Sequence, residues 1–348
     1  MFLIVCHHFS HYGHFNFSPD KITLNRLWVQ FLSIGGKISV NIYVMISGYF
    51  LINSKNVKIN KFLKLELQLI TYSLLKLVIG LLTKKITFSF KVLVYYMFPV
   101  TYDIWWFPTT YMILYLIFPV INSCVHALNR VTYRNYLIFM AIIWSVIPTL
   151  IVKDVYLCNN LVWFTFLYLI AGYLRKYSIG ENTKSTKWIV YGVLIGLTIY
   201  LLSIICDIIG LFYAEAAKGS GYLIGYSMVP DLIASVLILI GFTRINIQNK
   251  FINFISTTTF GIYLLHDGEI TRPWIWHDIL KVETYTNSNL LIPYSIFAIV
   301  SVFVVGSIIE IIRIYTIEKL YMKLVDFISK KLDHLIEKFT NWKLVQKL

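Results

Sequence analysis

The residues best suited to chemistry in this chain lie at its start. Four of its eight histidines occupy the first fourteen positions, directly after the apolar run Met1–Cys6; they are His7, His8, His11 and His14. An imidazole has an unperturbed pKa of about 6.5, which suits proton transfer near neutral pH. Because an imidazole pair at the end of an apolar segment is costly without a partner or a task, we expect at least one of these side chains to transfer protons.

The composition places these histidines in a membrane protein. Hydrophobic residues make up 58% and charged residues 14% of the 348 residues, whereas soluble domains carry about 25% charged residues. The net charge of +14 is explained by the positive-inside rule and by attraction to anionic lipid. No compact basic region interleaved with aromatic residues indicates nucleic-acid binding. The four cysteines form no Cys-x-x-Cys pair, so neither a disulfide nor a metal site is expected.

Ten apolar stretches are candidates for crossing a bilayer, which takes about 20 residues. After the N-terminal fragment they are Leu27–Ile52, Phe62–Leu82, Ile104–Val125, Tyr136–Val152, Leu161–Leu174, Trp188–Leu211, Tyr222–Phe242, Phe254–His266 and Leu290–Ile312. Val92–Val100 is apolar but short, and we expect it at the membrane interface. The pattern predicts an all-α polytopic membrane helix bundle of about ten spans.

Lysine and arginine residues follow every even-numbered stretch. They are Lys55, Lys58, Lys61 and Lys64 after the second, Arg130 and Arg134 after the fourth, Arg175, Lys176, Lys184 and Lys187 after the sixth, and Arg244 and Lys250 after the eighth. The positive-inside rule then puts these ends and both termini in the cytoplasm of a multi-pass plasma-membrane protein. Lys84, Lys85 and Lys91 are exceptions, since they lie outside in this arrangement.

The end of the chain has a different pattern. From Ile317 to Leu348, apolar residues recur at helical spacing with lysines between them. This predicts an amphipathic helix on the cytoplasmic leaflet, with a helix that binds a partner or a second subunit as the alternative. We therefore divide the chain into a membrane domain, residues 1–313, and a basic tail, residues 314–348. The sequence does not define an oligomeric state.

Three segments carry a resemblance to a known family. They are Ile4–Phe9, an apolar run that ends in His-His-Phe; the glycine-led stretch from Gly35 to Leu51, which ends in Ser-Gly-Tyr-Phe-Leu; and Thr258–Asp267, which contains Ile-Tyr-Leu-Leu-His. The aromatic run Trp105–Phe107 resembles a further helix of the family. In order and spacing they are similar to the acyltransferase-3 family, integral-membrane acyltransferases that include the O-acetyltransferases of bacterial surface polysaccharides.

The resemblance implies a reaction and a catalytic residue. Members move an acyl group, here most simply acetyl, from cytoplasmic acetyl-CoA to a hydroxyl of a capsular or exopolysaccharide glycan or of its lipid-linked precursor. Acetyl-CoA is then a donor substrate, and no tightly bound cofactor is expected. The acceptor hydroxyl needs a base, and the developing oxyanion needs hydrogen-bond donors. His8 takes the position of the family histidine, so we assign it as the base.

Candidate substrate-binding residues are distributed along the chain. They are Asn41, Trp106, Tyr111, His266 and Asp267. Asn41 binds substrate or bridges helices, and His266 with Asp267 orients the substrate or the base, or simply ends a span. The tryptophan and the tyrosine stack on sugars or belong to the aromatic belt.

Three lysines are candidates for binding the donor. Lys55, Lys58 and Lys61 could attract the phosphates of coenzyme A, or they could act only as topology determinants. Ser47 is not expected to be a nucleophile, because no Gly-x-Ser-x-Gly elbow surrounds it; Ser47-Gly48 favours close helix packing.

The first helix departs from the family pattern. Only Met1–Phe9 precede the polar stretch, and nine helical residues cover about 13 Å, under half the hydrocarbon thickness. The arginine with which the family holds the acyl donor has no counterpart. We therefore expect that upstream codons are missing or that half a helix has been lost, and that the chain as written has low activity.

Two other functions fit some of the same features. A polysaccharide flippase or another multi-span transporter would share the spans and the aromatic lining, with the histidines as gating or proton-relay residues. A haem-binding membrane protein would use His7 or His8 together with His266. Transfer of labelled acetyl tests the first alternative, and an absorbance spectrum tests the second.

Overall fold

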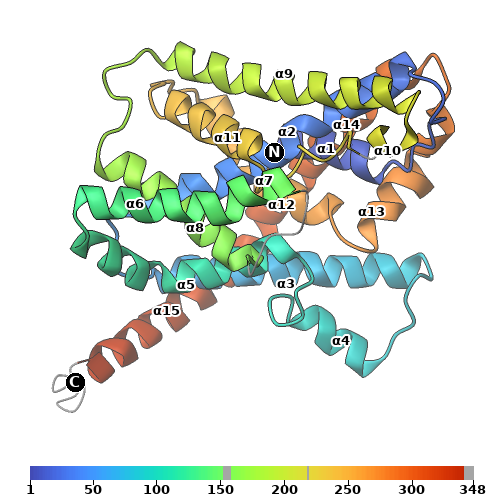
Figure 1. Ribbon diagram of the computed structural model, residues 1–348. Helices are drawn as coiled ribbons and strands as arrows, with labels where there is room; N and C mark the ends of the chain where they lie inside the picture. Colours follow the sequence, from blue (N-terminus) through green and yellow to red (C-terminus); the bar gives the residue numbers. More distant parts are fainter. Residues whose placement is uncertain (152–157, 218, 341–348) are drawn as a thin grey trace.

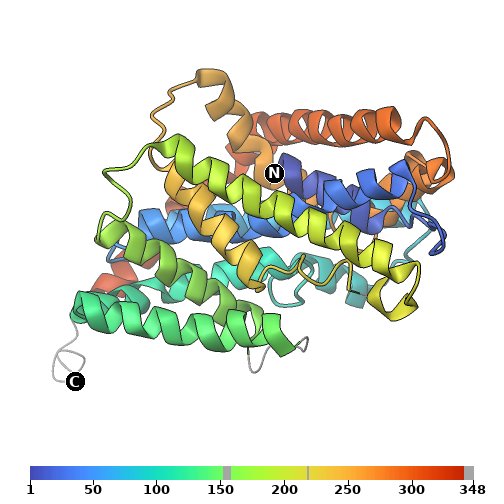
Figure 2. The same cartoon turned by 45° about the horizontal axis from the view of Figure 1, so that its top comes forward.

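The protein is a bundle of helices whose long axes run roughly side by side (Figures 1 and 2). The structure, a computed structural model, describes residues 1–151, 158–217 and 219–340. All regular secondary structure in these residues is helical, and they contain no strand. The all-α prediction is therefore confirmed for this part of the chain.

Six helices among the described residues are long and apolar enough to cross a membrane. They are α2 (Leu24–Leu51), α3 (Ile59–Leu82), α5 (Trp106–Ala127), the run α6–η1–α7 (Arg130–Ile151), α9 (Ser185–Gly210), and the helix that starts as α14 (Leu291–Arg313). Four shorter helices match predicted spans in part: α1 (Phe2–Tyr12), α8 (Asn160–Lys176), α11 (Val229–Phe242) and α12 (Lys250–His266). The count of ten spans stays a prediction.

Some predicted boundaries were wrong. The stretch predicted to begin at Tyr222 becomes helical only at Val229, because turns precede it and Pro230 takes an initial helical position, where its missing N–H costs nothing. The stretch predicted from Tyr136 begins at Arg130, capped by Asn129, and its predicted end at Val152 lies outside the described residues. The predicted interfacial segment contains the short helix α4 (Phe90–Met97).

The connections contain short helices. These are α10 (Ala214–Ala217), α13 (Thr271–Pro273), η2 (Trp274–Ile279) and η3 (Val282–Tyr285). We call the end of the bundle where α2 ends and α3 begins the basic end, because Lys55, Lys58 and Lys61 lie there. The connection between α8 and α9 and the C-terminal helix lie at the same end, on the left in Figure 1.

The tail continues the last long helix without a break. α14 passes through η4 (Ile314–Glu318) into α15 (Lys319–Thr340), which packs against α3. Val325 and Ser329 of α15 are buried, so one face of this helix contacts protein. Residues 341–348, including Trp342, lie outside the described residues. The placement of α15 on a lipid leaflet stays a prediction.

A buried ion pair within α14 is hydrogen-bonded to α3. Arg313 donates from Nε and Nη2 to the two carboxylate oxygens of Glu310, at 2.7 and 2.8 Å. Gln68 and Tyr72 of α3 donate to the same carboxylate at 2.8 and 2.7 Å. Charges in a membrane helix must be paired and hydrogen-bonded in this way to be tolerated. The network fixes the register of α3 against α14.

Two consecutive glycines allow α1 to approach α2 closely. A Cβ atom on Gly36 would lie 2.3 Å from the Cβ of His7, and one on Gly35 would lie 3.1 Å from the Leu3 side chain. α1 also packs against α14, and its residues from Ile4 to Phe9 are buried. The glycine-led start of this α2 segment therefore positions the helix that carries the histidines.

Gly36→Ala is expected to destabilise the protein by about 1–3 kcal/mol, because the added methyl group overpacks the contact with His7. Acyl transfer should fall with it, since α1 must shift. Thermal unfolding in detergent and an activity assay measure both effects. Gly196→Ala is the matched control, because its Cβ would meet no atom closer than 3.8 Å. Equal behaviour of the two variants would contradict the close approach of α1.

Candidate active site

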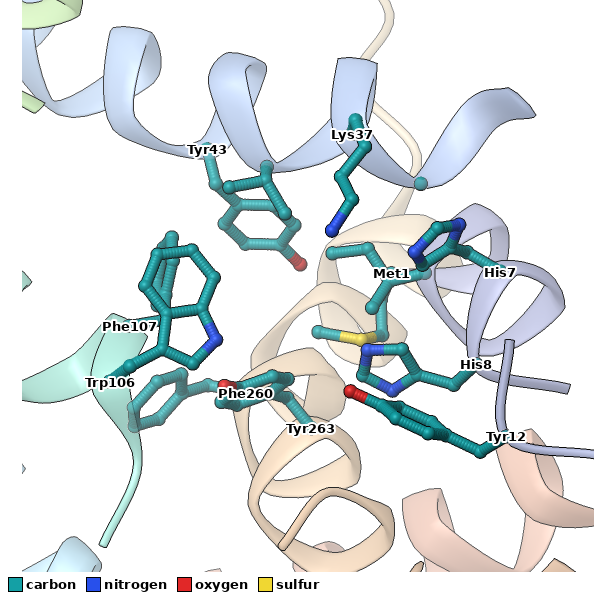
Figure 3. Close-up of a pocket in the computed structure, with 13 residues that line it drawn as sticks. Met1, His7, His8, Tyr12, Lys37, Tyr43, Trp106, Phe107, Phe260 and Tyr263 are labelled. Atoms are coloured by element: carbon teal, nitrogen blue, oxygen red, sulfur yellow. The ribbon is translucent and has the colours of Figure 1, made fainter. Parts of the chain in front are cut away.

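A cavity of about 60 Å³ lies between α1, α2, α5 and α12 (Figure 3). Side chains from all four helices point into it; among them are His8, Tyr12, Lys37, Tyr43, Trp106 and Tyr263. We call it the central cavity. Of the residues predicted from sequence, it contains His8 and Trp106. The resemblance thus selected two side chains that are 98 positions apart in sequence and that the fold brings to one cavity.

His8 is held by a second buried histidine at the end of α12. The Nδ1 atom of His8 lies 2.9 Å from Nε2 of His266. His8 is 9% exposed and His266 is fully buried. Metal ions lie about 2.0–2.1 Å from each imidazole nitrogen, so two nitrogens on opposite sides of one ion are about 4 Å apart. These two nitrogens are closer than that and lie at hydrogen-bond distance.

The hydrogen bonds of this pair define which nitrogen of His8 is free. Nδ1 of His266 lies 2.5 Å from the backbone oxygen of Ile262, which only accepts, so this nitrogen carries a hydrogen. In a neutral ring its Nε2 then has the lone pair and accepts from Nδ1–H of His8. The Nε2 of a neutral His8 is consequently unprotonated. The His8 ring points into the central cavity (Figure 3), where this nitrogen can accept a proton.

Asp267 fixes the chain immediately after His266. Its backbone oxygen accepts from Nε1 of Trp105 at 2.8 Å and from Nζ of Lys76. Its carboxylate accepts from Nε and Nη2 of Arg272, at 3.2 and 2.5 Å. Burial alone would raise the pKa of this carboxyl, but the charge of Arg272 and its hydrogen bond hold the pKa below its ordinary value. Asp267 therefore stays ionised and anchors the end of α12.

The other early histidines have separate contacts. Nδ1 of His7 lies 2.8 Å from the backbone oxygen of Ser33, and its ring stacks on His11 with centroids 5.6 Å apart. His7 also lines the central cavity. His14 stacks on His277, outside the cavity, at 4.3 Å. Among these four residues, only His8 forms the hydrogen-bonded pair with His266.

Asn41 lies outside the residues that line the central cavity. Its Nδ2 donates to the backbone oxygen of Tyr226 at 2.8 Å, and its Oδ1 accepts from Nε1 of Trp163 at 3.1 Å. It is fully buried. Of the two roles left open by sequence, these contacts match helix bridging.

A second pocket of about 510 Å³ opens beside the first, between α2, α3 and α5. Tyr111, predicted to bind substrate, lines this pocket rather than the central cavity, and its hydroxyl oxygen accepts from Ser47 at 3.1 Å. Lys61 and Lys64 lie at its edge. Lys55 and Lys58 are exposed nearby in sequence but are not among the residues that line it.

The two spaces lie along the same pair of helices. On α2 the lining passes from Tyr43 to Ser47, one helical turn apart. On α5 the rings of Phe107, Tyr111 and Tyr115 stack in succession, with centroids 6.4 and 6.5 Å apart. An aromatic track therefore runs from the lysines of the basic end toward His8.

Sequence reasoning missed several residues around His8. Tyr12 and Tyr263 line the central cavity, as does Lys37. The lysine had a sequence signal, since it is a lone charge inside the apolar stretch Leu27–Ile52. The tyrosines had none, because nothing in the local pattern shows which of the chain's 25 tyrosines face one cavity.

The chain is thus an apolar helical bundle with a buried, hydrogen-bonded histidine pair beside an internal cavity. The sequence model of the acyltransferase-3 family, described as an acyltransferase domain, matches residues 1–311, and the chain belongs to this family. This confirms the resemblance and makes the protein a membrane acyltransferase. No curated protein and no solved structure matched the chain.

Proposed function

We propose that the protein is an O-acetyltransferase that moves acetyl from acetyl-CoA to a hydroxyl of a cell-surface glycan or of its lipid-linked precursor. The observation that carries this proposal is the His8–His266 pair, which leaves a basic nitrogen on a ring that points into the central cavity. Membership of the acyltransferase-3 family supports acyl transfer as the reaction.

The reaction needs one base and no other nucleophile on the protein. The acceptor hydroxyl oxygen attacks the thioester carbonyl carbon while Nε2 of His8 takes the hydroxyl proton. The tetrahedral intermediate then expels the thiolate of coenzyme A, which receives that proton. His266 keeps the His8 ring in the required tautomer and orientation, in the role that an acidic residue plays in hydrolase triads.

We place acetyl-CoA in the second pocket, with its acyl end pointing along the aromatic track toward His8. Lys61 and Lys64 at the rim supply positive charge for the phosphates, and Lys55 and Lys58 add to the field. The largely apolar lining of the pocket suits the thin pantetheine arm. This placement requires the basic end, where α15 lies, to face the cytoplasm in a plasma-membrane protein.

Lys61→Glu is expected to raise the KM for acetyl-CoA about threefold to tenfold with little change in kcat, as for a partly screened charge pair. The difference from wild type should shrink as salt rises. Initial rates in membrane vesicles at varied donor concentration measure this. Lys91→Glu, an exposed residue of α4 away from the second pocket, is the control. A change of the same size in both variants would refute the donor site.

We place the acceptor sugar in the central cavity. Trp106, Phe107 and Tyr263 offer ring faces there, and apolar ring faces are suited to stacking against the C–H face of a sugar. Phe107 belongs to the aromatic track that leads to the second pocket, so acceptor and donor would meet beside His8.

The function is tested by supplying labelled acetyl-CoA to membranes that contain the protein and following label into glycan. NMR of the surface polysaccharide with and without the gene should show O-acetyl signals that depend on it. Transport of glycan without transfer of label would instead support the alternative, a flippase or another multi-span transporter.

A further inference from the structure

Lys37 is a charged side chain in the middle of the membrane helix α2. A charge at this depth is costly, and it normally marks a functional site or has a partner. Its side chain points into the central cavity, toward the space beside His8 (Figure 3). Among the described residues, its Nζ forms no hydrogen bond or ion pair. The carboxylates whose charges reach it are Asp231 and Asp267.

A second buried lysine shows what a purely structural role looks like in this protein. Lys76 of α3 is 3% exposed. Its Nζ donates to the backbone oxygen of Asp267 and lies 3.8 Å from the centre of the Trp105 ring. Lys76 therefore has protein partners, whereas the ammonium of Lys37 is presented to the cavity.

We propose that Lys37 stabilises the oxyanion of the acyl-transfer step. The inference rests on the proposed function. When the acceptor oxygen bonds to the carbonyl carbon, the electron pair of the C=O double bond moves to the carbonyl oxygen, and the hydroxyl proton goes to His8. The Lys37 ammonium donates a hydrogen bond to this oxygen and releases it when the C–S bond to coenzyme A breaks.

The arrangement of the cavity suits this role. Lys37 and Tyr43 reach into the cavity from α2, whereas His8 comes from α1 and Trp106 from α5 (Figure 3). A thioester carbonyl between them would face the base on one side and the cation on another. In a site that excludes water, such a donor acts far more strongly than it does in solution. Because the ammonium has no protein partner, it needs no rearrangement before it binds the oxyanion.

The competing role for Lys37 is to balance the charge of Asp231 on α11. This residue is fully buried, and neither of its carboxylate oxygens has a hydrogen-bond partner among the described residues. Removal of the lysine would then damage folding rather than catalysis. The double variant Lys37→Met with Asp231→Asn separates the two roles, because it removes both charges together.

Lys37→Met should lower kcat about 10²–10³-fold, as loss of one oxyanion donor does, while the KM for acetyl-CoA stays within about threefold. Lys37→Arg keeps the charge and should recover part of the rate. Membrane insertion and thermal unfolding should match wild type, and the double variant should be as inactive as Lys37→Met.

Near-normal kcat in Lys37→Met would overturn the proposal, as would an effect confined to KM. Loss of folding in Lys37→Met that the double variant repairs together with activity would show that Lys37 is a countercharge. These outcomes require an active wild type. If wild-type membranes transfer no acyl group and His8→Ala behaves as wild type, the proposed function itself fails.

Discussion

His8→Ala is expected to reduce acyl transfer by about 10²–10⁴-fold, the contribution of a positioned general base, while the protein still inserts and folds. A hydrogen-bond chain through His266 to Ile262 defines the tautomer of His8 and leaves its Nε2 free on a ring that points into the central cavity. Initial rates with labelled acetyl-CoA in membranes, normalised to the amount of folded protein, measure the effect.

His7→Ala is the matched control, since it removes a neighbouring imidazole of the same helix that also lines the cavity. Because His7 bonds to the backbone oxygen of Ser33, its loss should lower the rate of acyl transfer by less than about tenfold. If His7→Ala is inactive and His8→Ala is active, the wrong imidazole has been assigned. If both variants are active, the base lies elsewhere.

The membrane class and the helical fold could be predicted from the sequence, because hydrophobic composition and the spacing of apolar residues are local properties of the chain. Helix starts were predicted less well: the helices capped by Asn129 and Asn249 begin several residues before the predicted apolar stretches, because their first turns contain polar residues. Short helices were harder, since α8 and α11 are buried by neighbours rather than made stable by length. The continuity of α14 with α15 was missed, because the change from apolar to lysine-rich sequence suggested a boundary. The absence of a proline or glycine between the two helices was the signal for a continuous helix.

Only part of the site could be predicted in the same way. The motif resemblance selected His8 and His266, but not the fact that they touch across 258 positions. Sequence also grouped Tyr111 with Trp106 as sugar-binding residues, whereas the helix rotation between them puts Tyr111 in the second pocket. Contacts of this kind depend on the packing of α1, α2, α5 and α12, which no local pattern contains.

His266→Phe should lower kcat about 10²–10³-fold and leave the KM for both substrates nearly unchanged. The ring shape is kept, but the acceptor for Nδ1–H of His8 is lost, so His8 can adopt the other tautomer with its lone pair turned away from the cavity. In hydrolase triads the corresponding change of tautomer costs about 10⁴-fold; a neutral partner should contribute less.

His266→Gln is the variant that tests the tautomer argument itself. The amide oxygen of glutamine can accept from Nδ1–H of His8. We therefore expect kcat of His266→Gln to be at least about tenfold higher than kcat of His266→Phe. A purely structural role of His266 predicts the opposite order, because phenylalanine suits a fully buried position better than an amide does. Thermal unfolding of both variants, measured beside kcat and KM, distinguishes the two accounts: a fall in kcat that follows stability rather than the hydrogen-bond acceptor would contradict the assignment of His266 as the residue that orients the base.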